Sequence, residues 1–238
     1  MRRNQMLSPE AEAEAEGALL RRLEDDIIFG RLAPGTRLVE DAMMERYAAS
    51  RHYVRRALAA LERDGLVHLA RHVGATVCTF SPQEVRQIYE VREMLTRQII
   101  LMIPLPAPAP LLARLEAIQA EYRREEAAPD LRRLHELNDA FHLAMFEACG
   151  NPYLVRTAKD YMRLTLPVRA ANLASPQGLQ RSRGEHEIML DLLRGTDGWA
   201  LAQLNIDHMR GSKNDYIARA AQTAASPSPL TERTGNRS

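Results

Sequence analysis

The stretch that decides the fold runs Ser50-Arg51-His52-Tyr53-Val54-Arg55-Arg56-Ala57-Leu58-Ala59-Ala60-Leu61-Glu62-Arg63-Asp64-Gly65-Leu66-Val67. Its apolar residues recur at the i, i+3, i+4, i+7 spacing of a helix that buries one face: Val54, Ala57, Leu58 and Leu61. Ser50 is a favourable N-cap, and Gly65 is a residue type at which helices commonly end. The pattern therefore predicts a helix over about 51–64.

The segments on both sides of this helix complete a small domain. The predicted elements are helices over about 18–30 and 40–48 before it and strands over about 66–69 and 75–79 after it. Three helices followed by a hairpin is the order of a winged helix-turn-helix domain, which we expect over residues 18–80. Residues 1–17 are rich in Ala and Glu, and we expect them to form a flexible arm.

The outer face of the 51–64 helix is basic near its N-terminal end. Arg51 and Arg55 lie four residues apart, opposite the apolar stripe, as a DNA recognition helix requires. A solvated basic face is the alternative, but the helix order and the glycine in the hairpin favour DNA. We expect the DNA-contacting residues to be Ser50, Arg51, His52, Tyr53, Arg55, Arg71 and Gly74. Because one such domain covers few base pairs, we expect a homodimer on a pseudo-palindromic operator.

After Ser81-Pro82 the sequence predicts helices only, in an all-α domain over residues 81–222. The expected helices span about 82–102, 110–127, 130–149, 152–173, 177–194 and 198–222. A proline-rich linker, 104–110, separates the first two. Residues 223–238 are rich in Ser, Pro and Thr, and we expect a disordered tail. The fold class is thus mostly α, a winged helix-turn-helix followed by a helical-bundle effector domain.

Three histidines of this domain lie on the apolar stripes of three different helices: His142, His186 and His208. Asn138 stands one turn before His142, so both side chains can face one centre. Inward-facing imidazoles bind divalent ions, with zinc the first candidate and nickel or manganese the others. Any one of the three alone fits a hydrogen-bonded core histidine better, whereas the three together favour a metal site.

The N-terminal half resembles the GntR family of bacterial transcriptional regulators. Leu23-(x)3-Ile27-Ile28-Phe29-Gly30-Arg31-Leu32-Ala33-Pro34-Gly35-(x)2-Leu38 looks like the first helix and turn of that family. The stretch from Ser50 to Val67 looks like its recognition helix and first wing strand. The resemblance implies DNA contacts at Ser50, Arg51, Arg55 and Gly74. This chain departs from it at Asp41, where some members have a DNA-contacting arginine, and at His52-Tyr53, which replaces a small pair.

The C-terminal half resembles the FCD-type effector domain in its shorter, six-helix variant. The motifs are Asn138-Asp139-Ala140-Phe141-His142, Gly150-Asn151-Pro152, Glu185-His186-(x)-Ile188 and His208-Met209. The resemblance implies that Asn138 and the three histidines hold a metal, which binds a small carboxylate effector. Many members have Asp in place of Asn138, and Asp139 should point about 100° away from it around the helix. Arg92 matches an effector-pocket arginine, although a salt bridge with Glu93 or a neighbouring helix is equally compatible.

Two rival functions follow from the same residues. A metal-dependent hydrolase fused to a DNA-binding module would need a general base beside the metal. The sequence has no HExxH, and we expect Glu185 and Glu187 to point away from the histidines. The other rival is a DNA-binding protein without an effector. We expect a ligand-responsive transcriptional regulator that acts as a repressor, and we expect no enzymatic activity.

Composition restricts the cellular setting. The 238 residues include two cysteines, far apart, which fits a reducing cytoplasm. No apolar run is long enough to span a bilayer, and no apolar leader follows the N-terminus. We therefore expect a cytoplasmic protein without a membrane partner. The net charge of +1 does not by itself indicate nucleic acid.

Overall fold

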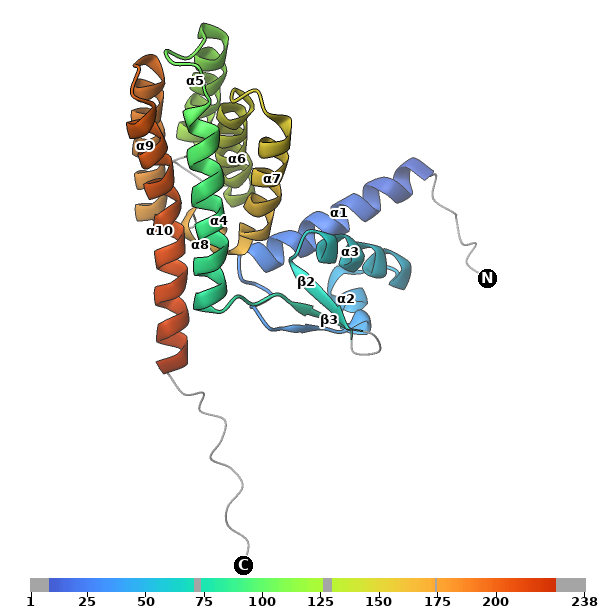
Figure 1. Ribbon diagram of the computed structural model, residues 1–238. Helices are drawn as coiled ribbons and strands as arrows, with labels where there is room; N and C mark the ends of the chain where they lie inside the picture. Colours follow the sequence, from blue (N-terminus) through green and yellow to red (C-terminus); the bar gives the residue numbers. More distant parts are fainter. Residues whose placement is uncertain (1–8, 71–73, 126–129, 174, 226–238) are drawn as a thin grey trace, which may run out of the picture.

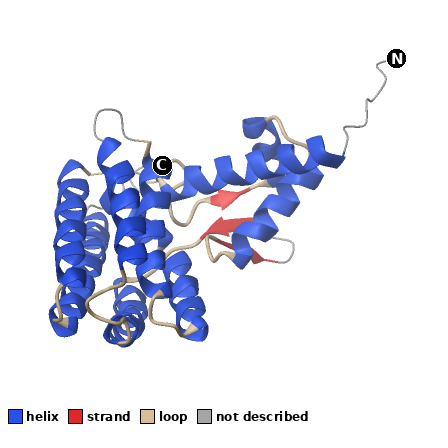
Figure 2. Cartoon of the chain, turned by 90° about the horizontal axis from the view of Figure 1, so that it is seen from above, coloured by secondary structure: helices blue, strands red, loops and turns tan. Residues whose placement is uncertain are grey.

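The computed structural model describes residues 9–70, 74–125, 130–173 and 175–225 and shows two parts (Figure 1). The N-terminal part combines helices with a small sheet, and the C-terminal part is a bundle of helices. Seen from above in Figure 2, the strands all lie in the N-terminal part, beside the bundle. The expected fold class is confirmed.

The N-terminal part has the element order of a winged helix. Its elements are α1 (Pro9–Ile28), β1 (Arg37–Leu38), α2 (Glu40–Tyr47), α3 (Arg51–Arg63), β2 (Val67–Ala70) and β3 (Gly74–Val77). The sheet is antiparallel in the order β1-β3-β2, with Val67 opposite Val77 and Leu38 opposite Ala75. β1 was absent from the sequence prediction because two residues are too short to show an alternating pattern.

Helix α3 forms as its sequence predicts. The Ser50 hydroxyl accepts a hydrogen bond from the backbone N–H of Tyr53, which is the N-cap arrangement. The apolar stripe lies in the core of the N-terminal part, and Val54 and Leu61 are fully buried. Ala48 makes the turn between α2 and α3 in the left-handed region, at φ 51°. The opposite face of α3 is left at the surface.

The predicted flexible arm is partly helical. Helix α1 begins at Pro9, so residues 9–17 belong to it, and Glu16 forms an ion pair with Arg56 of α3. Ala and Glu are among the best helix formers, so this composition extends a helix that tertiary packing has already started. The predicted disordered tail began at residue 223, but residues 223–225 belong to the last helix of the chain. Residues 1–8 and 226–238 lie outside the described part of the chain.

The C-terminal part is built from α4 (Pro82–Leu101), α5 (Ala109–Arg124), α6 (Leu131–Glu147), α7 (Pro152–Leu164), α8 (Leu166–Leu173), α9 (Pro176–Arg194) and α10 (Gly198–Ala225). Ser81 and Glu84 form a capping box at the start of α4, which places the boundary helix directly after the sheet. Among the described helices, α4 and α10 pack against each other most extensively, and they lie side by side in Figure 1. Leu201 of α10 and Ile99 of α4 are fully buried in the bundle core.

One of the helices predicted from the sequence is divided into two helices in the structure. The stretch 152–173 divides at Thr165 into α7 and α8, so the described bundle has seven helices where six were predicted. Pro167 is the physical reason, because proline has no N–H for an intrahelical hydrogen bond and clashes with the preceding turn. The Thr165 hydroxyl also donates to the carbonyl of Tyr161 at 2.8 Å. The break redirects α8 toward the N-terminal part.

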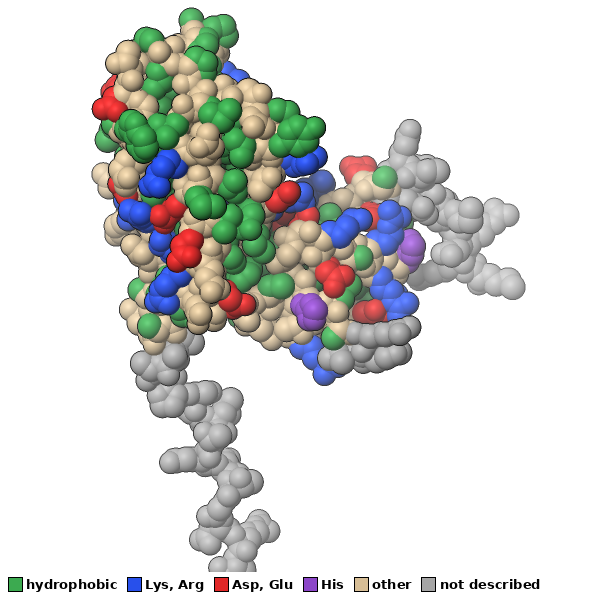
Figure 3. Space-filling model, in the orientation of Figure 1, with side chains coloured by type: hydrophobic (Ala, Val, Ile, Leu, Met, Phe, Trp, Pro, Cys, Tyr) green, Lys and Arg blue, Asp and Glu red, His purple; other side chains and the backbone are tan. Residues whose placement is uncertain are grey.

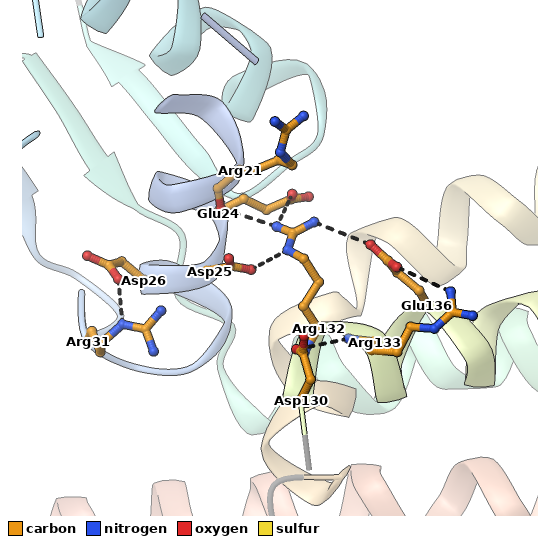
Figure 4. Close-up of polar contacts among 9 residues, drawn as sticks. All are labelled: Arg21, Glu24, Asp25, Asp26, Arg31, Asp130, Arg132, Arg133 and Glu136. Atoms are coloured by element: carbon orange, nitrogen blue, oxygen red, sulfur yellow. Dashed lines mark hydrogen bonds and ion pairs between the residues drawn. The ribbon is translucent and has the colours of Figure 1, made fainter. Parts of the chain in front are cut away.

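The two parts are joined by charged contacts and by the apolar side chain of Leu166. Arg132 of α6 donates to Asp25 at 2.6 Å and to Glu24 at 2.7 Å, both on α1 (Figure 4). Arg163 of α7 pairs with Asp64, the residue that follows α3. Leu166, at the start of α8, belongs to the hydrophobic core of the N-terminal part. The bundle therefore contacts both α1 and the end of α3.

Candidate metal and effector site

The three predicted histidines meet inside the bundle. The Nε2 atom of His142, on α6, lies 3.1 Å from Nε2 of His208, on α10. It lies 3.3 Å from Nε2 of His186, on α9. Three imidazole nitrogens from three helices thus face one point.

The outer nitrogens of two of these rings are held by neighbouring side chains. Nδ1 of His186 lies 3.1 Å from Oε1 of Gln119, on α5, and Nδ1 of His208 lies 2.6 Å from a carboxylate oxygen of Glu185. Partners of this kind fix ring orientation and tautomer in metal sites, leaving Nε2 as the ligand atom. Burial lowers the pKa of His142 and of His186 well below its usual value, so both rings are neutral. Neutral imidazole is the form that binds metal.

Asn138 completes a plausible donor set. Its side chain is buried one turn before His142, lines the same cavity, and has an Oδ1 atom without a hydrogen-bond partner. The three Nε2 atoms and this oxygen fit a divalent first-row ion such as zinc, nickel or manganese. A bound ion would supply a positive charge that attracts an anion.

The cavity beside the histidines has two arginines and several amide and hydroxyl side chains in a wall that also includes Phe146, Met162 and Met209. Its volume is about 40 Å³, where one ordered water molecule needs roughly 10–15 Å³. It is lined among others by Arg92, Asn138, His142, Arg169, Asn205 and His208. A few small atoms with negative charge would fit this space.

Arg92 lies in this cavity and forms no surface salt bridge. It is 6% exposed, its guanidinium stands 4.8 Å from the centre of the Tyr89 ring, and its Nη1 atom has no hydrogen-bond partner. Burial lowers its pKa. Glu93, the neighbour proposed as an alternative partner, instead accepts from Arg210 at 2.9 Å and from Lys213 at 2.8 Å. The geometry therefore favours the pocket interpretation of Arg92.

Two residues of the site differ from the sequence prediction. Glu185 was expected to point away from the histidines, and this was wrong, because it holds His208. Helix α10 lies close enough to receive its carboxylate, and no periodicity within α9 can show that. Arg169 of α8 was not singled out, yet it is buried in the cavity wall and pairs with Asp139 at 2.5 Å. Asp139 faces Arg169, as expected of a residue turned away from Asn138.

Three of the predicted DNA-reading residues, Arg51, Arg55 and Gly74, line one groove of the N-terminal part. Arg51, His52 and Arg55 are exposed on α3. Tyr53 is half-buried and packs against the hydrophobic core of the N-terminal part, so its ring also contributes to the packing of the fold. Gly74 begins β3 with φ +97°, where a Cβ would lie 3.3 Å from the carbonyl of Leu38. Arg71 lies outside the described residues.

Two acids at the start of α2 contact the exposed arginines of α3. Asp41 lies 2.5 Å from Arg51, and Glu40 lies 2.8 Å from Arg55. These four residues and Gly74 line a shallow groove between α2, α3 and the sheet. Figure 3 shows acidic and basic side chains mixed over this part of the molecule. The arginines are thus already oriented by neighbouring carboxylates.

Together the winged helix and the ligand cavity in a helical bundle define a class of protein, the one-component transcriptional regulators. Residues 16–77 match the family described as "Bacterial regulatory proteins, gntR family", and residues 87–211 match the FCD domain. The FCD match alone covers more than half of the chain. The chain belongs to the GntR family of regulators and carries an FCD domain.

Relatives agree with this assignment. The chain is 25% identical over 203 residues to the HTH-type transcriptional repressor GlaR of Escherichia coli (strain K12), covering 79% of this chain and 90% of that protein. It is 25% identical over 188 residues to the regulator YdhC of Bacillus subtilis (strain 168), covering 79% and 84%. These families and relatives are transcriptional regulators and not enzymes, which confirms the non-enzyme prediction.

Solved structures show the same fold. Escherichia coli McbR/YncC aligns with a TM-score of 0.63 at 19% identity, over 92% of this chain and 100% of that one. A GntR regulator from Rhodococcus sp. RHA1 aligns equally well, with a TM-score of 0.63 at 19% identity, over 90% and 100%. Among the described helices, none has the length and apolar character to cross a membrane.

Proposed function

We propose that this chain is a repressor that binds a pseudo-palindromic operator as a homodimer and responds to a small carboxylate held at a divalent metal. The observation that carries the proposal is the convergence of three histidine Nε2 atoms beside a cavity that Arg92 lines together with His142 and His208. A regulator of this kind acts in the cytoplasm, where the DNA is.

The exposed surface of the bundle supports a dimer. Met94 and Met102 of α4 are 65% and 38% exposed, and Trp199 of α10 is 67% exposed. In Figure 3, hydrophobic side chains gather on the bundle around α4. Large apolar side chains at a surface are typical of interaction sites. Two copies joined through the bundles would present two recognition helices to one DNA duplex.

The DNA-reading assignment is tested by substitution within α3. We expect Arg51→Ala and Arg55→Ala each to weaken operator binding by about 1–3 kcal/mol, because each removes a guanidinium that can bind guanine through two hydrogen bonds. Arg63→Ala is the control, since Arg63 is an exposed arginine in the last turn of the same helix. The measurement is a titration of labelled operator. Wild-type affinity in the Arg51/Arg55 double variant would refute the assignment.

The metal assignment is tested by analysing protein purified without a nickel column. We expect about one zinc, nickel or manganese ion per chain, lost in His142→Gln, His186→Gln and His208→Gln and weakened in Asn138→Ala. His135→Gln is the control, because His135 is a largely buried histidine on the same helix outside the cluster. Absence of metal from the wild type, with no rise in melting temperature on adding these ions, would favour hydrogen-bonded core histidines.

The effector assignment is tested by linking ligand binding to operator binding. A carboxylate that binds the metal-loaded protein should raise its melting temperature and should lower its affinity for the operator. The effector shifts the equilibrium only if it binds the two arrangements unequally. If every stabilising acid leaves operator affinity unchanged, the switching role is excluded while the binding site stands.

A further inference from the structure

Buried polar atoms without a hydrogen-bond partner concentrate on the residues that line the histidine cavity. Four such atoms belong to lining residues: Nη1 of Arg92, Nε of Arg169, Oδ1 of Asn138 and Oδ1 of Asn205. Buried polar atoms in folded proteins are nearly always paired. Two of these atoms are donors and two are acceptors, so a bound molecule that satisfies them has to supply both acceptors and donors.

The side chain of Arg92 is suited to bind a carboxylate of the ligand. Its guanidinium is buried, and no ion pair joins it to an acid among the described residues. Arg169 is also buried, but Asp139 balances its charge through contacts at 2.5 and 3.2 Å. Asp139 attracts both guanidinium groups but contacts only Arg169, so the two buried arginines carry one more positive charge than Asp139 neutralises, which is unfavourable. An anion in the cavity would remove this cost at Arg92, with Arg169 beside it as a further donor.

The side-chain oxygen of Asn205 lacks a hydrogen-bond donor. Its Nδ2 atom donates to the carbonyl of Leu201 at 2.9 Å, which fixes the orientation of the amide. The Oδ1 atom is then an acceptor that a carboxylate cannot satisfy, because an ionised carboxylate carries no hydrogen. A hydroxyl group satisfies it. The residue is 1% exposed, so bulk water is a poor substitute.

We propose that the effector is a short hydroxydicarboxylic acid. One carboxylate lies at the histidine cluster, the second is bound by Arg92 with Arg169 beside it, and the hydroxyl donates to Oδ1 of Asn205. This assignment rests on the proposed function, which requires only one carboxylate. The cavity volume of about 40 Å³ excludes a long chain, and even a four-carbon acid would require the lining side chains to move apart.

The test uses four matched four-carbon acids and zinc-loaded protein. Butyrate has one carboxylate, 3-hydroxybutyrate adds the hydroxyl, succinate adds the second carboxylate, and malate has both. We expect malate to bind most tightly by calorimetry and butyrate most weakly, with about a tenfold gain for each added group. The same order is expected for the rise in melting temperature.

Two variants assign the groups to residues. Arg92→Gln should weaken malate about tenfold, to the level of 3-hydroxybutyrate, and leave butyrate unchanged. Asn205→Leu should make malate and succinate equal. Because Arg92→Gln removes a buried unpaired cation, we expect it to fold with its zinc content intact. Arg92→Lys, which keeps the charge, serves as a second variant with intermediate affinity.

The outcomes separate this inference from the proposed function. If Arg92→Gln weakens butyrate as much as malate, Arg92 binds the only carboxylate and the dicarboxylate assignment is overturned. Equal binding of malate and succinate by the wild type would overturn the hydroxyl contact. If none of the four acids nor any other carboxylate binds the zinc-loaded protein, the proposed effector site itself fails.

Discussion

At the scale of single residues, two arginines of α3, Arg51 and Arg55, form ion pairs with acids of α2. Asp41 lies 2.5 Å from Arg51, and Glu40 contacts Arg55 at 2.8 Å and Arg51 at 4.0 Å. All of these contacts are at the surface, where an ion pair contributes little to stability. If Arg51 and Arg55 read bases as proposed, these contacts would affect DNA binding instead, because an arginine must leave its carboxylate to bind a base.

Asp41 should therefore weaken DNA binding. We expect Asp41→Asn to bind the operator more tightly, by about 0.5–1 kcal/mol, because Arg51 no longer gives up an ion pair and a negative charge near the phosphates is removed. The binding constant should also fall more steeply with salt concentration. Glu45→Gln is the control, since Glu45 is also on α2. Weaker binding by Asp41→Asn would instead mean that Asp41 itself contacts a base, such as the amino group of cytosine.

At the scale of elements, α8 connects the cavity to the N-terminal part. Arg169 and Asn172 of this helix line the cavity, and Leu166 at its start is buried in the core of the winged helix. The three residues lie within two turns of one short helix. If an anion bound in the cavity displaced Arg169, the displacement would reach the N-terminal part through α8 itself.

Truncation of Leu166 should uncouple the two parts. We expect Leu166→Ala to bind the acid as the wild type does, with an unchanged calorimetric affinity, while operator affinity no longer responds to the acid. The variant should lose about 2–4 kcal/mol of unfolding free energy, because a buried leucine is shortened. Leu190→Ala is the matched control, since Leu190 is a buried leucine in the core of the bundle. A normal response by Leu166→Ala would mean that the coupling runs through another element, such as α4, which directly follows the sheet.

The same elements show what the sequence can and cannot predict. The apolar spacing of α3 and the Ser50 cap are local signals, and both were predicted correctly. The inward direction of His142, His186 and His208 also follows from spacing along each helix. Glu185 and Arg169 could not be assigned, because their partners His208 and Asp139 come from other helices. Pro167 was a local signal for the break between α7 and α8, and the apolar pattern on both sides concealed it.

At the scale of the whole molecule, the position of the winged helix depends on a few charged contacts. Arg132 holds Glu24 and Asp25 of α1, and the three side chains are about a quarter exposed (Figure 4). Arg163 and Asp64 form the second such contact, at the end of α3. A repressor dimer needs its two recognition helices at a fixed separation, so these contacts bear on operator choice.

Charge reversal at Arg132 should loosen that separation. In Arg132→Glu a carboxylate faces Glu24 and Asp25, and like charges at an interface repel. We expect operator affinity to fall about tenfold at the preferred half-site spacing, while binding to operators with one base pair added or removed stays the same. Combining Arg132→Glu with Glu24→Arg and Asp25→Arg should restore the preference, because opposite charges face each other again. Arg114→Glu is the control, since Arg114 pairs with Glu147 within the bundle. An unchanged spacing preference in Arg132→Glu would show that the contacts of Arg163 and Leu166 suffice to hold the winged helix in place.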